Sequence, residues 1–231
     1  MWLQEKRIRD IVGAIVESVA DEVCKEHIDA ITQEPQLTSR IAQAIDSEFV
    51  RRLEREFGSS RVGDFYISMV VQEIPDHGRG SLESRIGADL YIGLETVLNG
   101  ETESKGLLVQ AKWDEPLTKS GAKGLRESCR RMLRKTSASY VWLYGRDGVT
   151  SLPAAGLKTK RVGKIRGGAS IGKLISEALA CREGDGRIGL PPARDRSERR
   201  RTLGGMLVEW SVSNGISVRV EKWNPDRPLD R

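Results

Sequence analysis

Hydrophobic residues recur at helical spacing in the first part of the chain. Between residues 2 and 31 they fall on every third or fourth position, at Ile8, Ile11, Val12, Ile15, Val16, Val19 and Val23, as in an amphipathic helix. Glu34-Pro35 predicts a break after this helix, because proline disfavours the helical conformation of the residue before it. A second helix is predicted with Thr38 as its N-cap and Gly58 as its stop.

The pattern changes from helical to β-type spacing after the second helix. Three apolar segments predict strands, at residues 64–74, 89–94 and 106–112. A polar, glycine-containing loop separates the first two strands, and Asn99-Gly100 predicts a tight turn between the last two. These strands can form a meander, in which each strand pairs with the next.

The second half of the chain has weaker signals. Residues 121–135 return to helical spacing, and residues 139–144 form a short apolar run typical of a buried strand. Beyond these we expect a helix around 171–179, a loop at 182–202, a helix near 203–212 and a strand at 216–222. The order helix, three strands, helix, strand predicts an α/β fold with a mixed central sheet and helices on its faces.

The length of 231 residues suits one compact domain with elaborations. The elements divide into three expected parts. These are an N-terminal helical arm at residues 1–36, a core at 37–146, and a C-terminal α/β extension at 147–231 that packs on the core.

The composition is that of a globular protein. Hydrophobic residues make up 38% of the chain and charged residues 31%, which excludes the disordered class. No apolar run approaches the roughly 18 residues that a membrane-spanning helix needs. The first residues carry scattered charges, unlike the apolar stretch of a secretory signal. We therefore expect a cytoplasmic protein that does not bind a membrane.

The scarcity of sulfur and imidazole ligands limits the kinds of metal site. The three cysteines, Cys24, Cys129 and Cys181, lie far apart, and the only histidines are His27 and His77. This set poorly supplies a zinc site, a disulfide framework or a Ser–His–Asp triad. A metal would have to be held by carboxylates, which favours Mg²⁺ or Mn²⁺.

Positive charge is concentrated in three segments, although the net charge is only +5. Residues 117–136 hold seven basic side chains against one acid, residues 158–173 hold six, and residues 194–201 hold five arginines. Such clusters can form a surface for a polyanion, and each can equally be a solvated face or loop. A position beside a reactive site favours the first interpretation.

The strand at 106–112 ends in polar residues that share a face. Alternation places Gln110 and Lys112 on the same side of this strand. A buried amide and a buried lysine both need polar partners. Asp89 begins the preceding strand, and a hairpin would bring it beside Gln110 and Lys112, because the start of one hairpin strand faces the end of the other.

This group of side chains suits the hydrolysis of a phosphodiester bond. That reaction requires stabilisation of charge on the phosphoryl oxygens and a water molecule held in line. Asp89 can bind a divalent cation, and the Gln110 side-chain carbonyl and the Ala111 backbone carbonyl can complete part of its shell. Lys112 can orient or help to deprotonate the water. The alternative is a turn aspartate and a lysine that extends to water.

Two stretches of the sequence resemble a known family. The PD-(D/E)xK nuclease superfamily resembles these stretches, which are IGADLYIGLE and KGLLVQAKW. Their motif is most similar to the Q-x-K variant of Mrr-like restriction endonucleases. The resemblance covers roughly residues 40–145 and implies a restriction-endonuclease-like core with the element order αβββαβ. It also implies that Asp89 is the metal-binding acid, that Gln110 replaces the second acid, and that Lys112 is the catalytic lysine.

Gln110 departs from most of the superfamily, which has Glu or Asp at that position. A neutral amide binds Mg²⁺ more weakly than a carboxylate, so a further catalytic acid is expected. Glu83, in the loop before Asp89, is the first candidate and a potential metal ligand. Glu48 is the second, because it lies on the helix that usually contributes an acid in such folds.

The helix after Lys112 offers a surface for nucleic acid, through Lys119, Lys123, Arg126, Arg130 and Arg134. We expect a Mg²⁺- or Mn²⁺-dependent endonuclease that acts on DNA, in restriction or anti-phage defence. Two alternatives remain open. One is an inactive nucleic-acid-binding module of the same fold, and the other is an interaction protein without affinity for nucleic acid. In either case the N-terminal helix could join a second copy or a partner protein.

Overall fold

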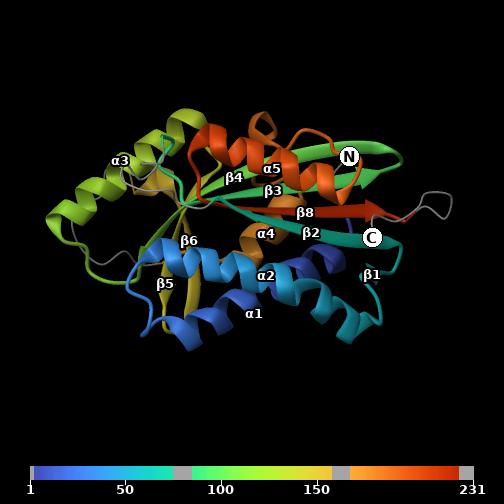
Figure 1. Cartoon of the computed structure of the whole chain (residues 1–231), viewed down its shortest axis with the longest axis horizontal. Helices are drawn as coiled ribbons and strands as arrows, with labels where there is room; N and C mark the ends of the chain where they lie inside the picture. Colours follow the sequence, from blue (N-terminus) through green and yellow to red (C-terminus); the bar gives the residue numbers. More distant parts are fainter. Residues whose placement is uncertain (1–2, 75–84, 158–166, 224–231) are drawn as a thin grey trace.

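A computed structural model of the chain describes residues 3–74, 85–157 and 167–223. Within these ranges the protein has an α/β fold, in which five α-helices surround one mixed sheet of eight strands (Figure 1). The helices are α1 (Lys6–His27), α2 (Glu34–Phe57), α3 (Lys119–Lys135), α4 (Ile171–Leu179) and α5 (Arg196–Trp210). The strands are β1 (Arg61–Val62), β2 (Phe65–Glu73), β3 (Leu90–Leu98), β4 (Glu101–Trp113), β5 (Ser139–Gly145), β6 (Gly148–Pro153), β7 (Ala169–Ser170) and β8 (Asn214–Lys222).

The predicted meander of the first three long strands is wrong. The strand order in the sheet is β1-β2-β8-β3-β4-β5-β6-β7, so the C-terminal strand β8 separates β2 from β3. It runs antiparallel to β2 and parallel to β3. Seven consecutive residues of β8 are buried, which is typical of a strand covered on both faces. The segment after residue 146 therefore supplies a strand to the centre of the sheet.

The predicted hairpin is confirmed. Strands β3 and β4 pair antiparallel from Leu90 opposite Val109 to Leu98 opposite Glu101. The two residues of the turn both have positive φ, at 55° for Asn99 and 84° for Gly100. This is the backbone that a two-residue hairpin turn of type I′ needs, and asparagine and glycine adopt it at low cost.

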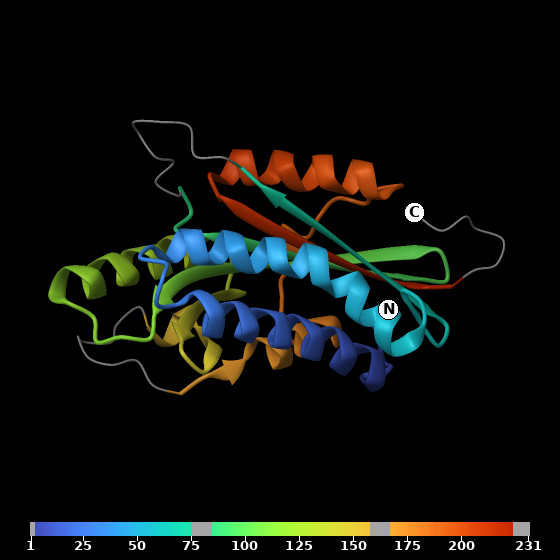
Figure 2. The same cartoon turned by 60° about the horizontal axis from the view of Figure 1, so that its bottom comes forward.

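Two hydrophobic clusters cover the two faces of the sheet. One face packs against α1, α2 and α4, and the other packs against α3 and α5. Figure 2 shows this layering, with α5 above the sheet and α1 and α2 below it. In the part of the chain that the structure describes, no helix is both long and apolar enough to cross a membrane.

The boundary between the first two helices differs from the prediction. Helix α1 ends at His27, and α2 already begins at Glu34, with Pro35 in its first turn. Proline is tolerated there because the first amide groups of a helix have no partner within the helix. Thr38 is therefore not the N-cap but an interior residue, and its hydroxyl donates to the carbonyl of Glu34 at 2.9 Å. Gly58 ends α2 as predicted, with φ of 73°.

Helix α5 begins at Arg196, seven residues before the helix predicted near 203–212, and so replaces the last third of the loop predicted at 182–202. Its N-cap is Asp195, whose carboxylate accepts from the amide of Glu198 at 2.7 Å. The Glu198 carboxylate in turn accepts from the amide of Arg194 at 2.7 Å. An acidic cap followed three residues later by glutamate is a helix-start signal, which the density of arginines obscured.

Candidate active site

The carboxylate of Asp89 lies against the end of β4. Its residue directly precedes β3, and its amide donates to the carbonyl of Val109 at 2.8 Å. Its Oδ2 accepts from the backbone amide of Ala111 at 2.9 Å and from the side-chain amide of Gln110. The structure therefore brings together Asp89 and Gln110, as the hairpin predicts.

Lys112 is paired with an acid that sequence reasoning did not select. Its Nζ lies 3.3 Å from Oε1 of Glu34, the first residue of α2, and each side chain is about a quarter exposed. The start of β3, the end of β4 and the start of α2 thus meet at one end of the sheet, on the left in Figure 1. Glu34 was missed because it appeared to belong to a helix break, not to a first helical turn.

Burial dominates the protonation of Asp89. Loss of solvent, with a smaller contribution from the charge of Glu34, raises the pKa of its carboxyl from 3.8 to about 6. The Ala111 amide, the Lys112 ammonium and the Gln110 amide act in the opposite direction but do not cancel the effect of burial. A cation bound nearby would lower the pKa of Asp89 again, because it favours the ionised form of the carboxyl.

Gly87 holds this corner of the sheet close to α3. Its φ is 76°, and a Cβ at this position would lie 2.8 Å from the backbone Cα and O of Ser128. Only glycine allows both the left-handed backbone and the close approach. The residue two positions before Asp89 therefore sets the start of β3 directly against the basic helix.

The donor set at this site fits a hard divalent cation. Asp89 and Glu34 supply carboxylates and Ala111 supplies a carbonyl oxygen, which are ligand types that Mg²⁺ takes alongside water and phosphate. The Nε2 of Gln110 donates both to Asp89 Oδ2 and to the Ala111 carbonyl, the latter at 3.3 Å. Asp89 Oδ2 and the Ala111 carbonyl oxygen thus both accept from the Gln110 side-chain nitrogen. A cation in place of that nitrogen would contact the same two oxygens.

The site is nevertheless sparse in charged ligands. No group of three or more His, Cys, Asp or Glu side chains within the described ranges could hold a metal ion. To offer its own oxygen to a cation, the Gln110 amide would have to turn over, because its nitrogen now faces Asp89. Carboxylates from only two residues are therefore available among those described here.

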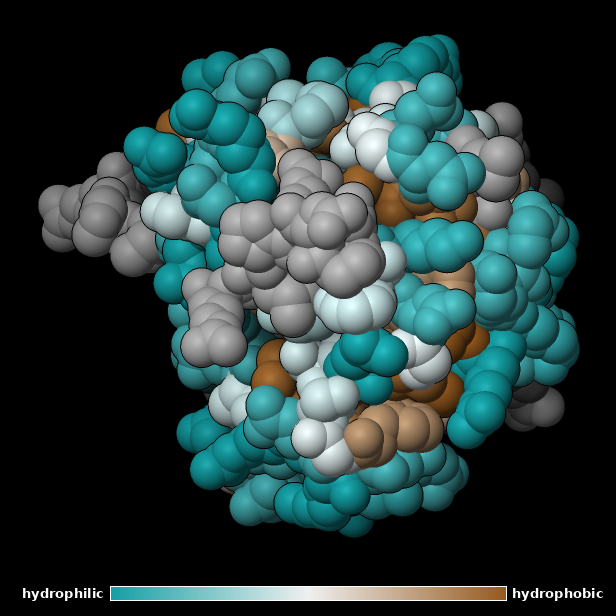
Figure 3. Space-filling model, turned by 90° about the vertical axis from the view of Figure 1, so that its right-hand side faces the viewer, coloured by the Kyte–Doolittle hydropathy of each residue, from teal (hydrophilic) through white to brown (hydrophobic). Residues whose placement is uncertain are grey.

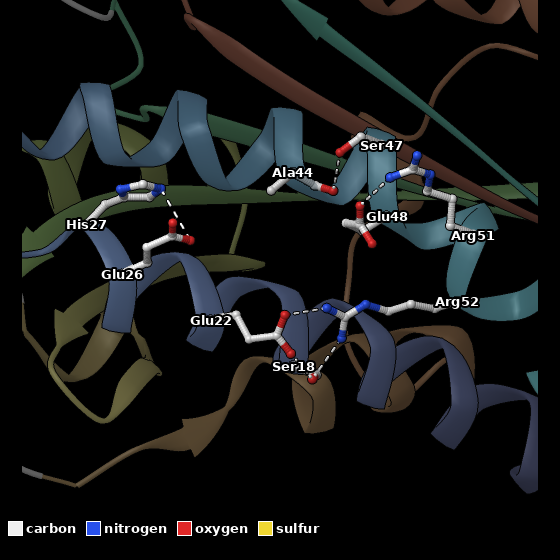
Figure 4. A network of polar contacts seen from close by, with 9 residues as sticks. All are labelled: Ser18, Glu22, Glu26, His27, Ala44, Ser47, Glu48, Arg51 and Arg52. Carbon is white, nitrogen blue, oxygen red and sulfur yellow. Dashed lines mark hydrogen bonds and ion pairs between the residues drawn. The ribbon is translucent and has the colours of Figure 1, made fainter. Parts of the chain in front are cut away.

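Of the two further acids selected from the sequence, only Glu48 can be located. Glu83 lies outside the described residues. Glu48 is on α2, as expected, but fourteen residues beyond Glu34, or about 21 Å along a helix with 1.5 Å rise per residue. Figure 4 shows Glu48 paired with Arg51, at 3.0 Å, in a region where Arg52 also binds Ser18 and Glu22 of α1. Glu48 thus lies apart from the first turn of α2, whose Glu34 contacts Lys112 of β4, and its catalytic role stays a prediction.

The basic side chains of α3 are placed at the same end of the sheet. Helix α3 connects β4 to the parallel strand β5, so its N-terminus lies near the end of β4 that carries Lys112. Lys119, Lys123, Arg130 and Arg134 are exposed, and Arg126 is half-buried. Arg130 lies 3.6 Å from the carboxylate of Glu127, an exposed pair with little energetic weight.

The positive charge of the molecule is concentrated in this helix. Without residues 117–136 the chain would hold 31 basic and 32 acidic residues. The opposite end of the molecule, at the right of Figure 1, has a mainly hydrophilic surface with hydrophobic side chains showing between (Figure 3). A basic helix of this kind can form a surface for a polyanion.

The arginines of residues 194–201 are largely engaged within the protein. Arg199 is 1% exposed and lies 3.7 Å from the buried carboxylate of Glu95. Arg196 and Arg200 both lie within 4 Å of Asp46 on α2. This segment is mainly a helix that packs on the sheet, and is a weaker candidate for a polyanion surface than α3. Most of the basic cluster at 158–173 lies outside the described residues.

No protein-family model and no curated protein matches this chain. The arrangement of its own side chains is therefore the basis for assigning a function.

Proposed function

We propose that this protein is a metal-dependent endonuclease that hydrolyses phosphodiester bonds in DNA. The observation that carries the proposal is the convergence of Asp89, Gln110, Lys112 and Glu34 at one end of the sheet. A role in restriction or in defence against foreign DNA would agree with the resemblance of the Gln-Ala-Lys strand to Mrr-like nucleases.

The order of elements from α2 to β5 also favours a PD-(D/E)xK core. A helix leads into the strands, an antiparallel hairpin carries the acid and the lysine, and a helical crossover leads to a strand parallel to the second hairpin strand. The insertion of β8 between β2 and β3 is an elaboration that the resemblance does not imply.

Asp89 and Glu34, with the carbonyl of Ala111 and the turned amide of Gln110, would hold Mg²⁺ or Mn²⁺. When bound, such a cation neutralises charge on the phosphoryl oxygens and lowers the pKa of a water ligand. The side chains that would hold the cation are partly buried, so these electrostatic interactions are stronger there than in bulk water.

Lys112 and Glu34 act as a pair at the reacting phosphate. The Lys112 ammonium donates hydrogen bonds and can contact a phosphoryl oxygen or the attacking water. Glu34 restricts its position through the contact at 3.3 Å and can itself accept a proton from that water. The exposed lysines and arginines of α3 hold the flanking phosphates, which positions DNA without reading its sequence.

The decisive experiment is incubation of supercoiled plasmid DNA with the protein and Mg²⁺ or Mn²⁺, with chelator in a parallel reaction. We expect nicking or linearisation that depends on the metal and is lost in Asp89→Asn, Lys112→Ala and Glu34→Gln. Glu101→Gln, at the far end of the same hairpin, is the matched control and should retain activity. Metal-dependent cleavage that survives in all three site variants would exclude this site.

Gln110 favours one alternative, an inactive DNA-binding module. A neutral side chain at the position of the second acid weakens the affinity for metal, and loss of that acid is a simple route to loss of catalysis. This alternative predicts salt-sensitive binding to duplex DNA without metal-dependent cleavage under any of these conditions.

A further inference from the structure

The first turn of α2, which carries Glu34, has no side-chain cap of its own. Its N-cap residue is Gln33, whose side chain makes no capping hydrogen bond, and Pro35 has no amide to donate. A helix start of this kind frays easily unless tertiary contacts hold it. The position of Glu34 relative to Lys112 must therefore be set by contacts from outside the helix.

Two buried hydroxyl groups link this turn to the sheet, one from Thr38 within α2 and one from Tyr144 outside it. The Oγ1 of Thr38 lies 2.9 Å from the carbonyl oxygen of Glu34 and 2.8 Å from the phenolic oxygen of Tyr144 on β5. The carbonyl can only accept, so Thr38 donates its single proton to Glu34, and Tyr144 must then donate to Thr38. Both residues are about 1% exposed, and burial raises the pKa of Tyr144, which keeps the phenol as a donor.

Tyr144 is at the same time joined to the strand end that carries Lys112. It pairs in register with Trp113, the residue after Lys112, and their rings meet edge to face at 6.1 Å. Its backbone carbonyl accepts from the amide of Asp114 at 2.8 Å. One residue therefore contacts both the strand that presents the lysine and the helical turn that presents the acid.

We propose that Tyr144 and Thr38 are positioning residues, which fix Glu34 against Lys112 through the hydrogen-bond chain Tyr144–Thr38–Glu34. Neither side chain contacts substrate in this role. The effect of the chain on cleavage rests on the proposed nuclease function, whereas its effect on the Glu34–Lys112 contact does not.

The test of catalysis uses Thr38→Val, which keeps the shape and removes the hydroxyl, and Thr38→Ser, which restores it. In plasmid cleavage we expect Thr38→Val to lower kcat about tenfold, the effect of losing one well-placed hydrogen bond of about 1.4 kcal/mol. KM should stay within about twofold, and Thr38→Ser should restore the rate. A loss in Thr38→Val that Thr38→Ser does not restore would show a general packing role and overturn the proposal.

A second measurement separates this proposal from the nuclease assignment. The ¹H–¹⁵N signal of the Lys112 ammonium is recorded in the full chain without metal or DNA. We expect Thr38→Val, Tyr144→Phe and Glu34→Gln to move this signal alike, and Thr38→Ser to leave it in place. If this result is obtained but the wild type cleaves no DNA, the positioning stands and the nuclease function fails.

An unchanged ammonium signal together with an unchanged rate would overturn the proposal. If Thr38→Val and Tyr144→Phe keep both the wild-type signal and the wild-type rate, the hydrogen-bond chain positions nothing. Tyr144→Phe preserves the ring that packs on Trp113, so it provides the answer if the threonine variant does not fold. Thermal unfolding of each variant is recorded first to establish that it is folded.

Discussion

At the scale of single residues, Asp89 is a buried carboxylate at the proposed metal site. Its pKa is raised from 3.8 to about 6 by burial, so the folded state binds its proton more tightly than the unfolded state. Below pH 3.8 Asp89 is protonated in both states, so its burial does not lower the free energy of unfolding. As the pH rises from 3.8 to 6, Asp89 ionises in the unfolded state but stays protonated in the folded state, so the free energy of unfolding falls. Above pH 6 the loss of stability is complete.

Asp89→Asn should therefore stabilise the protein at high pH while it abolishes cleavage. Asparagine can still accept from the Ala111 amide but has no charge to bury. The gain should approach about 3 kcal/mol at pH 8, at 1.36 kcal/mol per pKa unit, and vanish near pH 3.5. Urea unfolding at the two pH values measures it, with the exposed Asp64→Asn as control. An equal stability of wild type and Asp89→Asn at pH 8 would contradict the burial effect.

Substitutions of Gln110 provide a second test at the scale of single residues. Gln110→Glu places a carboxylate beside Asp89, so it should tighten Mg²⁺ binding and destabilise the metal-free protein at pH 8, because two like charges then share a buried site. Gln110→Ala should weaken the metal affinity. Isothermal titration of Mg²⁺ into wild type and both variants checks this order, and three equal affinities would remove Gln110 from the metal site.

At the scale of elements, the proposed binding of DNA depends on α3. If its exposed arginines contact phosphates, the slope of log K against log salt reports the number of such contacts, at about 0.9 per phosphate on duplex DNA. Substituting Arg130 and Arg134 together with glutamine should flatten this slope by nearly two units, and adding Arg126→Gln should take it to between two and three.

The matched control for α3 is the pair Arg196→Gln and Arg200→Gln. These arginines lie on α5 and face Asp46, so the slope should stay close to that of the wild type. Fluorescence anisotropy with two unrelated duplexes, over a range of KCl concentrations, measures both sets. If the control pair flattens the slope and the α3 set does not, DNA binds at α5 instead.

At the scale of the whole molecule, a buried ionic cluster joins the C-terminal elements to the hairpin. Glu95 on β3 is fully buried and lies 3.7 Å from Arg199 on α5 and 3.5 Å from Arg219 on β8. Burial raises the pKa of Glu95, and the two arginines oppose that rise. Arg199 also donates to Ser68, and Arg219 donates to the Ala193 carbonyl.

Glu95→Gln should destabilise the fold strongly, because it removes the buried carboxylate that both guanidinium groups face. Breaking a buried ion pair in this way typically costs about 3–5 kcal/mol. Urea unfolding should show this loss, whereas the exposed Glu101→Gln on the same hairpin should change stability by less than about 0.5 kcal/mol. A Glu95→Gln protein as stable as the control would mean that the cluster contributes no net stability.

Sequence alone determined the features that depend on neighbours along the chain. The spacing of isoleucines and valines predicted α1, and the Asn99-Gly100 turn predicted the β3–β4 hairpin. That hairpin placed Asp89 beside Gln110, because a two-residue turn fixes the register of both strands. The basic helix and the C-terminal strand were likewise visible in local patterns.

Only the tertiary structure decided which distant elements become neighbours. The insertion of β8 between β2 and β3, the pairing of Glu34 with Lys112 and the burial of Arg199 beside Glu95 all join segments far apart in sequence. An alternating strand or a glutamate before a proline has the same local signature whatever lies across from it. The partner is chosen by how all the apolar faces are covered together, which no local pattern encodes.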